Sequence, residues 1–283
     1  MRNTTTILKI SKDFFVKNII NILFFSLAIY ILTLGSNSNG SGPEIVFFDV
    51  GQGDAILIQQ DNFQILIDGG PDDRILYELA KKMPKNDKTI EVVVLTHPHE
   101  DHVRGLANVL EGYVVEKFLL NRVEFENKAY KYLLENYKDI LVEVVKGDTI
   151  QYRDILATVL FPFDEEREEY ANLNNESVLL LLEVYDYKIL LMGDGEVELE
   201  QRLLEDLDIE NIHILKVGHH CSKTSSSEMF LRRVNPMIGI CSCGKGNRFG
   251  HPHYETLQKF EMLNVQYLIT YMEGNIVIKF DDL

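Results

Sequence analysis

Cysteine is scarce in this 283-residue sequence, which contains only Cys221, Cys241 and Cys243. An odd number of cysteines clustered late in the chain provides no disulfide framework, so the fold has to depend on a hydrophobic core. Alternation along a strand that begins with the apolar run 237–240 would place Cys241 and Cys243 on one face. We expect them to be small buried residues, and we assign Cys221 no role as a metal ligand.

Basic residues are in the minority. The chain has 28 Lys and Arg against 44 Asp and Glu, which gives a formal net charge of −16. This balance works against sequence-independent binding of nucleic acid, because such binding needs Lys and Arg to neutralise phosphates. Net charge describes the whole surface, so it leaves room for a local basic groove. Two bound divalent cations would also offset part of the negative charge at a site.

No internal repeat is visible, and 46% hydrophobic residues are enough for a large core. Short apolar runs alternate with helical patterns, which predicts a layered α/β domain. The expected strands are 45–48, 55–58, 63–67, 92–95, 118–120, 141–145, 155–161, 178–184, 188–191, 212–217, 267–270 and 276–280. The expected helices are 75–83, 101–110, 127–137, 197–207, 226–234 and 254–263.

Residues 1–35 form a separate segment. Its apolar run 19–34, with 14–16 counted in, approaches the ~20 residues that span a bilayer. Basic residues precede the run, and no charge follows it up to residue 43. The basic residues are Arg2, Lys9, Lys12 and Lys17. This asymmetry predicts a single-pass anchor in the cytoplasmic membrane, with the C-terminal domain outside the cytoplasm. A signal peptide cleaved after Gly35, which would give a secreted protein, is the alternative.

Residues 36–43 are rich in Gly, Ser and Asn. Such a composition cannot bury surface and predicts a flexible linker. The folded domain is therefore expected to span residues 44–283.

Three histidines and an aspartate gather in one short turn. His97, His99, Asp101 and His102 follow the predicted strand at 92–95 and lead into a predicted helix. Neutral imidazole and carboxylate are ligands that zinc, manganese and iron accept. A turn from a strand to a helix can direct several side chains at one point, so the sequence predicts a metal site here.

Two later segments offer more ligands of the same kind. Asp194 follows the predicted strand at 188–191, and the pair His219 and His220 follows the predicted strand at 212–217. Adjacent residues at a strand end point to opposite sides, so we expect one of the two histidines to be a ligand.

These segments resemble the metallo-β-lactamase superfamily, in which such a motif supplies two adjacent metals. The resemblance implies an αββα sandwich, with two mixed β-sheets and helices on the outer faces. It favours His219 over His220 as the later ligand. It also implies His97 and His99 for the first metal, Asp101 and His102 for the second, and Asp194 as the bridge.

A narrower resemblance covers residues 44–283 and is to the hydrolase domain of ComEC-type DNA-uptake proteins and its stand-alone secreted relatives. The matching segments are 48–55 (FDVGQGDA), 66–70 (LIDGG), 173–178 (LNNESV), 217–223 (VGHHCSK) and 247–252 (NRFGHP). The long polytopic channel region of the uptake proteins has no counterpart in this sequence, which argues against DNA transport by the chain itself.

One departure from the superfamily concerns the first metal. Many members have another histidine before the bridging acid, but no histidine lies between His102 and Asp194 here. The segment 174–177 occupies that region. The first metal would then have three protein ligands and an open coordination position, which makes manganese a competitor to zinc. The expected cofactors are two divalent ions, Zn2+ or Mn2+, that share a hydroxide nucleophile.

Other residues are expected around these metals. A histidine beside an anion can hydrogen-bond a phosphate oxygen or protonate a leaving alkoxide, which is the role expected of His251. The predicted catalytic residues are Asp101, Asp194 and His251. The predicted substrate-binding residues are Asn175, Ser177, Lys223, Asn247 and His251. Asp49, Asp54, Asp68 and His220 are expected to be metal ligands or to orient the ligand histidines.

The sequence thus predicts a dinuclear metal-dependent hydrolase that acts outside the cytoplasmic membrane. Its predicted substrate is a phosphodiester, with DNA as one candidate. Two alternatives stay open: a hydrolase of another ester, a lactone or a choline phosphodiester, and a low-turnover accessory module of DNA uptake. The intact set of ligands argues against the second.

Overall fold

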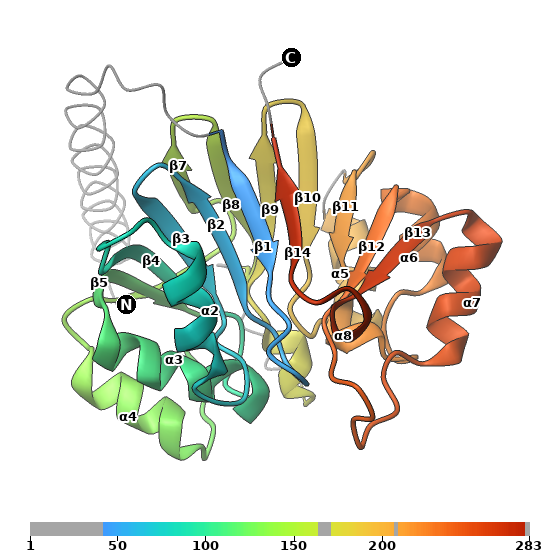
Figure 1. Ribbon diagram of the computed structural model, residues 1–283. Helices are drawn as coiled ribbons and strands as arrows, with labels where there is room; N and C mark the ends of the chain where they lie inside the picture. Colours follow the sequence, from blue (N-terminus) through green and yellow to red (C-terminus); the bar gives the residue numbers. More distant parts are fainter. Residues whose placement is uncertain (1–41, 164–170, 207–208, 281–283) are drawn as a thin grey trace, which may run out of the picture.

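The structure, a computed structural model, describes residues 42–163, 171–206 and 209–280 (Figure 1). Within these residues two β-sheets of seven strands each pack face to face, and helices cover both outer faces. This is the αββα sandwich that the motifs implied. The predicted anchor at 1–35 and most of the predicted linker at 36–43 lie outside the described residues. None of the helices in the described part of the chain has the length and apolar character needed to cross a membrane.

The first sheet has the strand order β14-β1-β2-β3-β4-β5-β6. Its strands are β14 (Ile276–Lys279), β1 (Glu44–Phe47), β2 (Ile56–Gln60), β3 (Phe63–Ile67), β4 (Thr89–Leu95), β5 (Val114–Leu120) and β6 (Leu141–Glu143). The pairs from β14 to β3 are antiparallel, and those from β3 to β6 are parallel. The sheet is therefore mixed, and the last strand of the chain pairs with the first described one.

The second sheet is mixed in the same way, with the order β13-β12-β11-β10-β9-β8-β7. Its strands are β13 (Gln266–Ile269), β12 (Ile238–Cys241), β11 (Ile214–Lys216), β10 (Tyr187–Leu191), β9 (Leu179–Val184), β8 (Ile155–Phe161) and β7 (Thr149–Tyr152). The pairs from β13 to β10 are parallel and the others are antiparallel.

Strand alternation builds the layers. On β4, Val92 and Val94 belong to the core between the sheets, whereas Val93 and Leu95 belong to the core under the outer helices. Successive side chains of a strand point to opposite faces, so a strand covered on both sides reads as a continuous apolar run. The first sheet is covered by α2 (Arg74–Lys82), α3 (Glu100–Gly112) and α4 (Lys128–Asn136), and the second by α5 (Val197–Asp206), α6 (Glu228–Val234) and α7 (Tyr254–Leu263). Shorter helices are η1 (Leu173–Glu176), η2 (Gly218–Cys221) and α8 (Thr270–Glu273).

The structure corrects the expectation for the cysteines. A disulfide joins Cys221 to Cys241, with their Cα atoms 5.5 Å apart. The pairing is non-local: η2 follows β11, which runs beside β12, so two residues 20 positions apart meet at the ends of neighbouring strands. Cys243 is a free buried thiol. The predicted burial of all three residues is confirmed.

The first turn of α3 is held tightly against the loop that follows β3. The amide of Gly69 donates to the carbonyl of His102 at 2.8 Å, and the amide of Gly105 donates to the carbonyl of Gly70 at 3.0 Å. A Cβ at position 105 would overlap the carbonyl oxygen of Gly69. Only glycine permits this approach, which brings His102 beside Asp68.

We expect Gly105→Ala to destabilise the domain by about 1–3 kcal/mol or more, although alanine favours helices, because the added methyl group forces α3 away from the loop. The free energy of unfolding in denaturant measures this. Gly112→Ala in the same helix is the control, since its Cβ would meet Leu76 at 3.7 Å, an ordinary contact. Equal stability of the two variants would contradict the packing argument.

Candidate metal centre

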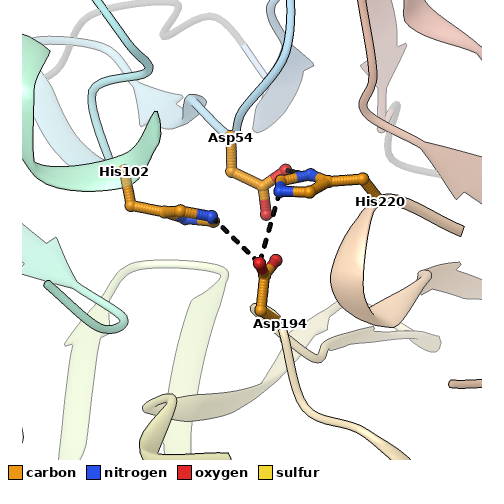
Figure 2. Close-up of side chains that lie close together, drawn as sticks. All are labelled: Asp54, His102, Asp194 and His220. Carbon is orange, nitrogen blue, oxygen red and sulfur yellow. Dashed lines mark ion pairs between the residues drawn. The ribbon is translucent and has the colours of Figure 1, made fainter. Parts of the chain in front are cut away.

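Four buried side chains from separate segments converge at one edge of the sandwich (Figure 2). Asp54 precedes β2, His102 lies in the first turn of α3, Asp194 follows β10, and His220 lies in η2. Their ligand atoms all lie within 4.8 Å of one another. Oδ2 of Asp194 is 3.4 Å from Nε2 of His102 and 3.3 Å from Nε2 of His220. These residues form the four-residue group.

A second group shares the same carboxylate. His97, His99 and Asp194 also have ligand atoms within 4.8 Å of one another, and we call them the three-residue group. Nε2 of His97 lies 3.7 Å from Oδ2 of Asp194 and 2.9 Å from Nδ1 of His99. Asp194 therefore occupies the position of a bridge between two neighbouring sets of ligands.

The donor atoms of the four-residue group fit a cation. Four of them are buried and have no hydrogen-bond partner among the described residues. They are Asp54 Oδ1, His102 Nε2, Asp194 Oδ1 and His220 Nε2. A buried polar atom without a partner costs about 1–3 kcal/mol, and more when it is charged. A divalent ion would satisfy all of them, since carboxylate oxygen and imidazole nitrogen are its ordinary ligands.

Neighbouring groups orient the ligand rings. Nδ1 of His102 lies 2.7 Å from Oδ2 of Asp68, and Thr96 donates to Asp68 from both its amide and its hydroxyl. Nδ1 of His220 lies 2.9 Å from the carbonyl of Ser242. An acceptor at Nδ1 places the proton there and leaves Nε2 free to face a metal. Asp68 thus lies where an orienting carboxylate is expected.

The structure places His220 in the centre, although the sequence favoured His219. His219, His220 and Cys221 have φ values of 45°, 54° and 64°, so three consecutive residues adopt the left-handed conformation. The preference for His219 came from the resemblance, whereas this turn brings the ring of His220 into the four-residue group. His219 belongs to neither ligand group, and its Nδ1 lies 2.7 Å from Oε1 of Glu196. Left-handed residues other than glycine cost about 1–2 kcal/mol each, and the disulfide of Cys221 tethers the end of the turn.

Asp101 also differs from its expected place. It lies in neither ligand group, and Asp54 fills the fourth position instead. Oδ2 of Asp101 is 3.3 Å from Nε2 of His220, at the partly exposed edge of the centre. Burial would raise the pKa of Asp101, but the close contact with His220 and the charge of His102 hold this pKa well below its usual value.

Lys216 was missed by the sequence reasoning. Its side chain is fully buried, and its ammonium lies 2.7 Å from Oδ2 of Asp54 and 2.9 Å from the carbonyl of Val217. Burial would raise the pKa of Asp54, but the charges of Lys216 and His220 lower it. One signal was available: a lysine inside a predicted buried strand needs a charged partner.

The pKa values of the histidines reflect the surplus of carboxylates. Burial alone would lower the pKa of His102 and His220, yet Asp194 and its neighbouring carboxylates raise both well above the usual value. Burial and the charge of His102 hold the pKa of His97 well below it. The four-residue group thus favours positive charge, and a metal ion would bind in competition with protons.

The segment 174–177 supports the ligands. Ser177 accepts a hydrogen bond from the amide of Asp194 at 3.1 Å, and its Oγ lies 3.3 Å from Nδ1 of His97. The side chain of Asn175 donates to Glu198 and accepts from the amide of Glu196. Both were expected to bind substrate, but their contacts here hold the loop after β10 in place.

Three other predicted residues lie farther out. Asn247 bonds four backbone groups of its own loop, from Gly244 to His251, so its amide organises that loop. Lys223 has an exposed side chain, and its amide donates to Nδ1 of His253. Asp49 accepts from the amide of Gly51 in the turn before Asp54. None of the three belongs to either ligand group.

His251 faces the centre from the loop between β12 and α7. Its ring centroid lies 6.0 Å from that of His220 and 5.3 Å from that of His219. Nδ1 of His251 is 3.4 Å from Nε2 of the Gln52 side chain. Burial, followed by the charges of His220 and His219, lowers the pKa of His251 to about 4. The ring is therefore neutral at neutral pH.

Comparison with known proteins agrees with this geometry. Residues 48–245 match the family described as the metallo-beta-lactamase superfamily. ComE operon protein 3 of Bacillus subtilis (strain 168) is 28% identical over 261 residues, which are 85% of this chain and 33% of that protein. Recombination protein 2 of Haemophilus influenzae is 28% identical over 281 residues, which are 96% of this chain and 34% of that protein. The chain thus spans about a third of the length of these relatives.

Solved structures share the fold. Igni18, a metallo hydrolase from the archaeon Ignicoccus hospitalis, aligns with a TM-score of 0.55 at 14% identity. The alignment covers 85% of this chain and all of that one. At so low an identity the likeness concerns the fold alone.

We expect Lys216→Met to destabilise the metal-free protein by about 3–5 kcal/mol, because it leaves the buried carboxylate of Asp54 without its partner. Added Zn2+ or Mn2+ should raise the melting temperature of the variant more than that of the unchanged protein, since the cation replaces the lost charge. Thermal melting with and without metal measures both effects. Lys188→Met, at a partly buried position near the start of β10, is the control. A Lys216→Met protein as stable as the control would contradict the role of the ion pair.

Proposed function

Because the chain belongs to the metallo-beta-lactamase superfamily and two of its ligand groups share one carboxylate, we propose that it is a dinuclear hydrolase of phosphodiester bonds that acts outside the cytoplasmic membrane. Asp194 carries this proposal. Its carboxylate is buried, lies within reach of five histidine or aspartate ligands, and has an oxygen without a hydrogen-bond partner among the described residues.

Each ligand group would hold one divalent ion, Zn2+ or Mn2+, and Asp194 would contact both. Such ions supply Lewis acidity and lower the pKa of a bound water to near neutrality. The protein's own residues fix the ligand geometry: Asp68 holds the proton of His102 on Nδ1, and the carbonyl of Ser242 does the same for His220. Lys216 keeps Asp54 charged.

His251 contributes as a neutral ring. The side-chain NH2 group of Gln52 lies 3.4 Å from its Nδ1 and can donate to it, so the tautomer that fits has its proton on Nε2. With a pKa of about 4, this ring donates a hydrogen bond to a substrate oxygen and does not deliver a proton at neutral pH. An anionic substrate would raise its pKa, because negative charge favours the protonated ring.

Local charge supports an anionic substrate. The exposed cationic residues Lys223, Lys245 and Arg248 lie on the loops that carry His219 and His251, in a chain whose net charge is −16. Arg248 contacts Phe249, which stacks on His251, so positive charge on this loop would attract a phosphodiester toward the centre. The relative named Recombination protein 2 supports DNA as the polymer.

The disulfide supports an extracytoplasmic location. Cys221 and Cys241 are 5.5 Å apart at Cα, and disulfides persist in oxidising compartments. Together with the predicted anchor at 1–35, the disulfide supports a location on the outer side of the membrane for the proposed hydrolase.

We expect the metal-loaded protein to hydrolyse single-stranded DNA and bis-p-nitrophenyl phosphate, but not nitrocefin. Asp194→Asn should lower turnover more than about 100-fold, which is a larger loss than that caused by removing a group that only orients a metal ligand. The variant should also bind fewer metal ions than the unchanged protein, which should hold close to two per chain. Kinetics and elemental analysis measure these effects, with Asp186→Asn in an exposed turn as the control. Hydrolysis of nitrocefin alone would overturn the substrate class, and turnover of none of the three would favour an accessory role.

We expect a reporter fused after Leu283 to lie outside the cytoplasm, because basic residues precede the apolar run and none follows it up to residue 43. Alkaline phosphatase at this position should be active, and green fluorescent protein exported through the general secretory route should be dark. The opposite pattern would place the domain inside. If the domain is outside, cell fractionation separates the two alternatives for residues 1–35. Full-length protein in the membrane fraction would indicate an anchor, and a soluble form that begins near Ser36 would indicate a cleaved signal peptide.

A further inference from the structure

A pocket of about 420 Å3 opens beside the metal centre. It lies between the loop that contains Asn247 and His251 and the elements α7, β13 and α8. Its apolar and aromatic lining comes from Leu257, Tyr267, Tyr271 and Met272. A volume of about 300–1,000 Å3 and a mainly apolar lining with a few polar groups are typical of small-molecule sites.

The pocket and the metal centre share one wall. His251 lines the pocket, and its ring also lies 6.0 Å from the ring of His220. A ligand with its phosphate at the metal centre and a flat group in the pocket would therefore reach from one side of the His251 ring to the other. A nucleotide has this arrangement, because one sugar joins its base to its phosphate.

The lining suits a nucleobase. Tyr267 and Tyr271 are partly buried, and Met272 is 65% exposed at the mouth of the pocket. Bases stack on aromatic side chains whatever their sequence, because every base has a π-face. The ring of His251 and the backbone around Gly246 and Gly250 supply polar groups at the edge, where a base carries its donors and acceptors.

The loop beside the pocket is cationic and aromatic. The guanidinium of Arg248 lies 4.7 Å from the centroid of the Phe249 ring, which in turn stacks on His251 at 5.6 Å with 20° between the planes. Arg248 and Phe249 are exposed, and so is Lys245 on the other side of Asn247. Positive charge next to aromatic rings is the combination that binds single-stranded nucleic acid.

We propose that this pocket binds the unpaired base next to the phosphodiester that is cut, so that the substrate is single-stranded nucleic acid. The proposal rests on the proposed phosphodiesterase function and adds a base-binding subsite to it. A base can enter only when it is not paired and stacked in a duplex, which gives the enzyme a preference for single strands.

An abasic substitution tests the subsite. One single-stranded DNA carries a normal base and a matched one carries a single tetrahydrofuran residue at the same position. The full-length metal-loaded protein should cut the bond flanking the abasic residue about 10-fold less efficiently, a loss in the range expected for one stacked base. The measured quantity is the ratio of the two cleavage efficiencies, normal DNA over abasic DNA. Tyr271→Leu should reduce this ratio to about one. Tyr254→Leu, which is exposed on α7 and outside the pocket, should leave it near 10.

The outcomes separate the two proposals. If the unchanged protein cuts both DNAs with equal efficiency, the base-binding subsite is wrong and the phosphodiesterase function stands. If it cuts neither, the phosphodiesterase function itself fails.

Two further measurements protect the test against a folding defect. If Tyr271→Leu does not melt cooperatively, Leu257→Phe replaces it, because the larger side chain fills the pocket. This variant should also reduce the ratio of the two cleavage efficiencies to about one. The fluorescence of 2-aminopurine at the tested position should also fall when the DNA binds the unchanged protein. Unaltered fluorescence on binding would overturn the subsite.

Discussion

Buried negative charge is the constraint on which the rest of this structure depends. Asp54, Asp68 and Asp194 are at most 2% exposed and meet at one edge of the sandwich. Carboxylates in such a place are stable only when cations and hydrogen-bond donors surround them. Lys216, Thr96 and the ligand histidines meet part of this need, and the unpartnered atoms that remain favour a metal ion.

The two ligand groups are unequal, and the segment 174–177 accounts for this. Many superfamily members have a histidine in this region, but here Ser177 contacts His97 and the amide of Asp194 without adding a ligand. The three-residue group therefore keeps open positions, and its His99 is only partly buried. The four-residue group is fully buried and has one more ligand.

Local patterns predicted most of the fold. The expected helix 254–263 agrees with α7, and the expected strand 92–95 with the buried end of β4, because each has a clear apolar pattern. The strand β7 was not predicted, since only one of its four residues, Ile150, is buried and no alternation is visible over so short a run. Local periodicity is informative only where a whole face is buried.

The site was less accessible to sequence reasoning than the fold. The ligand types and their segments followed from the motifs, but the choice of His220 depends on a left-handed backbone that residues without glycine rarely adopt. The pairs Lys216–Asp54 and Cys221–Cys241 are non-local, and no pattern along the chain records which segments meet.

The acidic composition and a nucleic-acid substrate are compatible because the charges are segregated. Carboxylates dominate the buried centre, where metal ions would reverse their effect on an approaching phosphate. Lys245 and Arg248 lie on the exposed loop next to His251, at the same edge of the sandwich. The chain as a whole carries a net charge of −16, which disfavours binding of a polyanion away from this edge. A nucleic-acid strand held only at this edge would bind weakly along its length and present one phosphodiester at a time. Such binding suits hydrolysis better than storage or scaffolding.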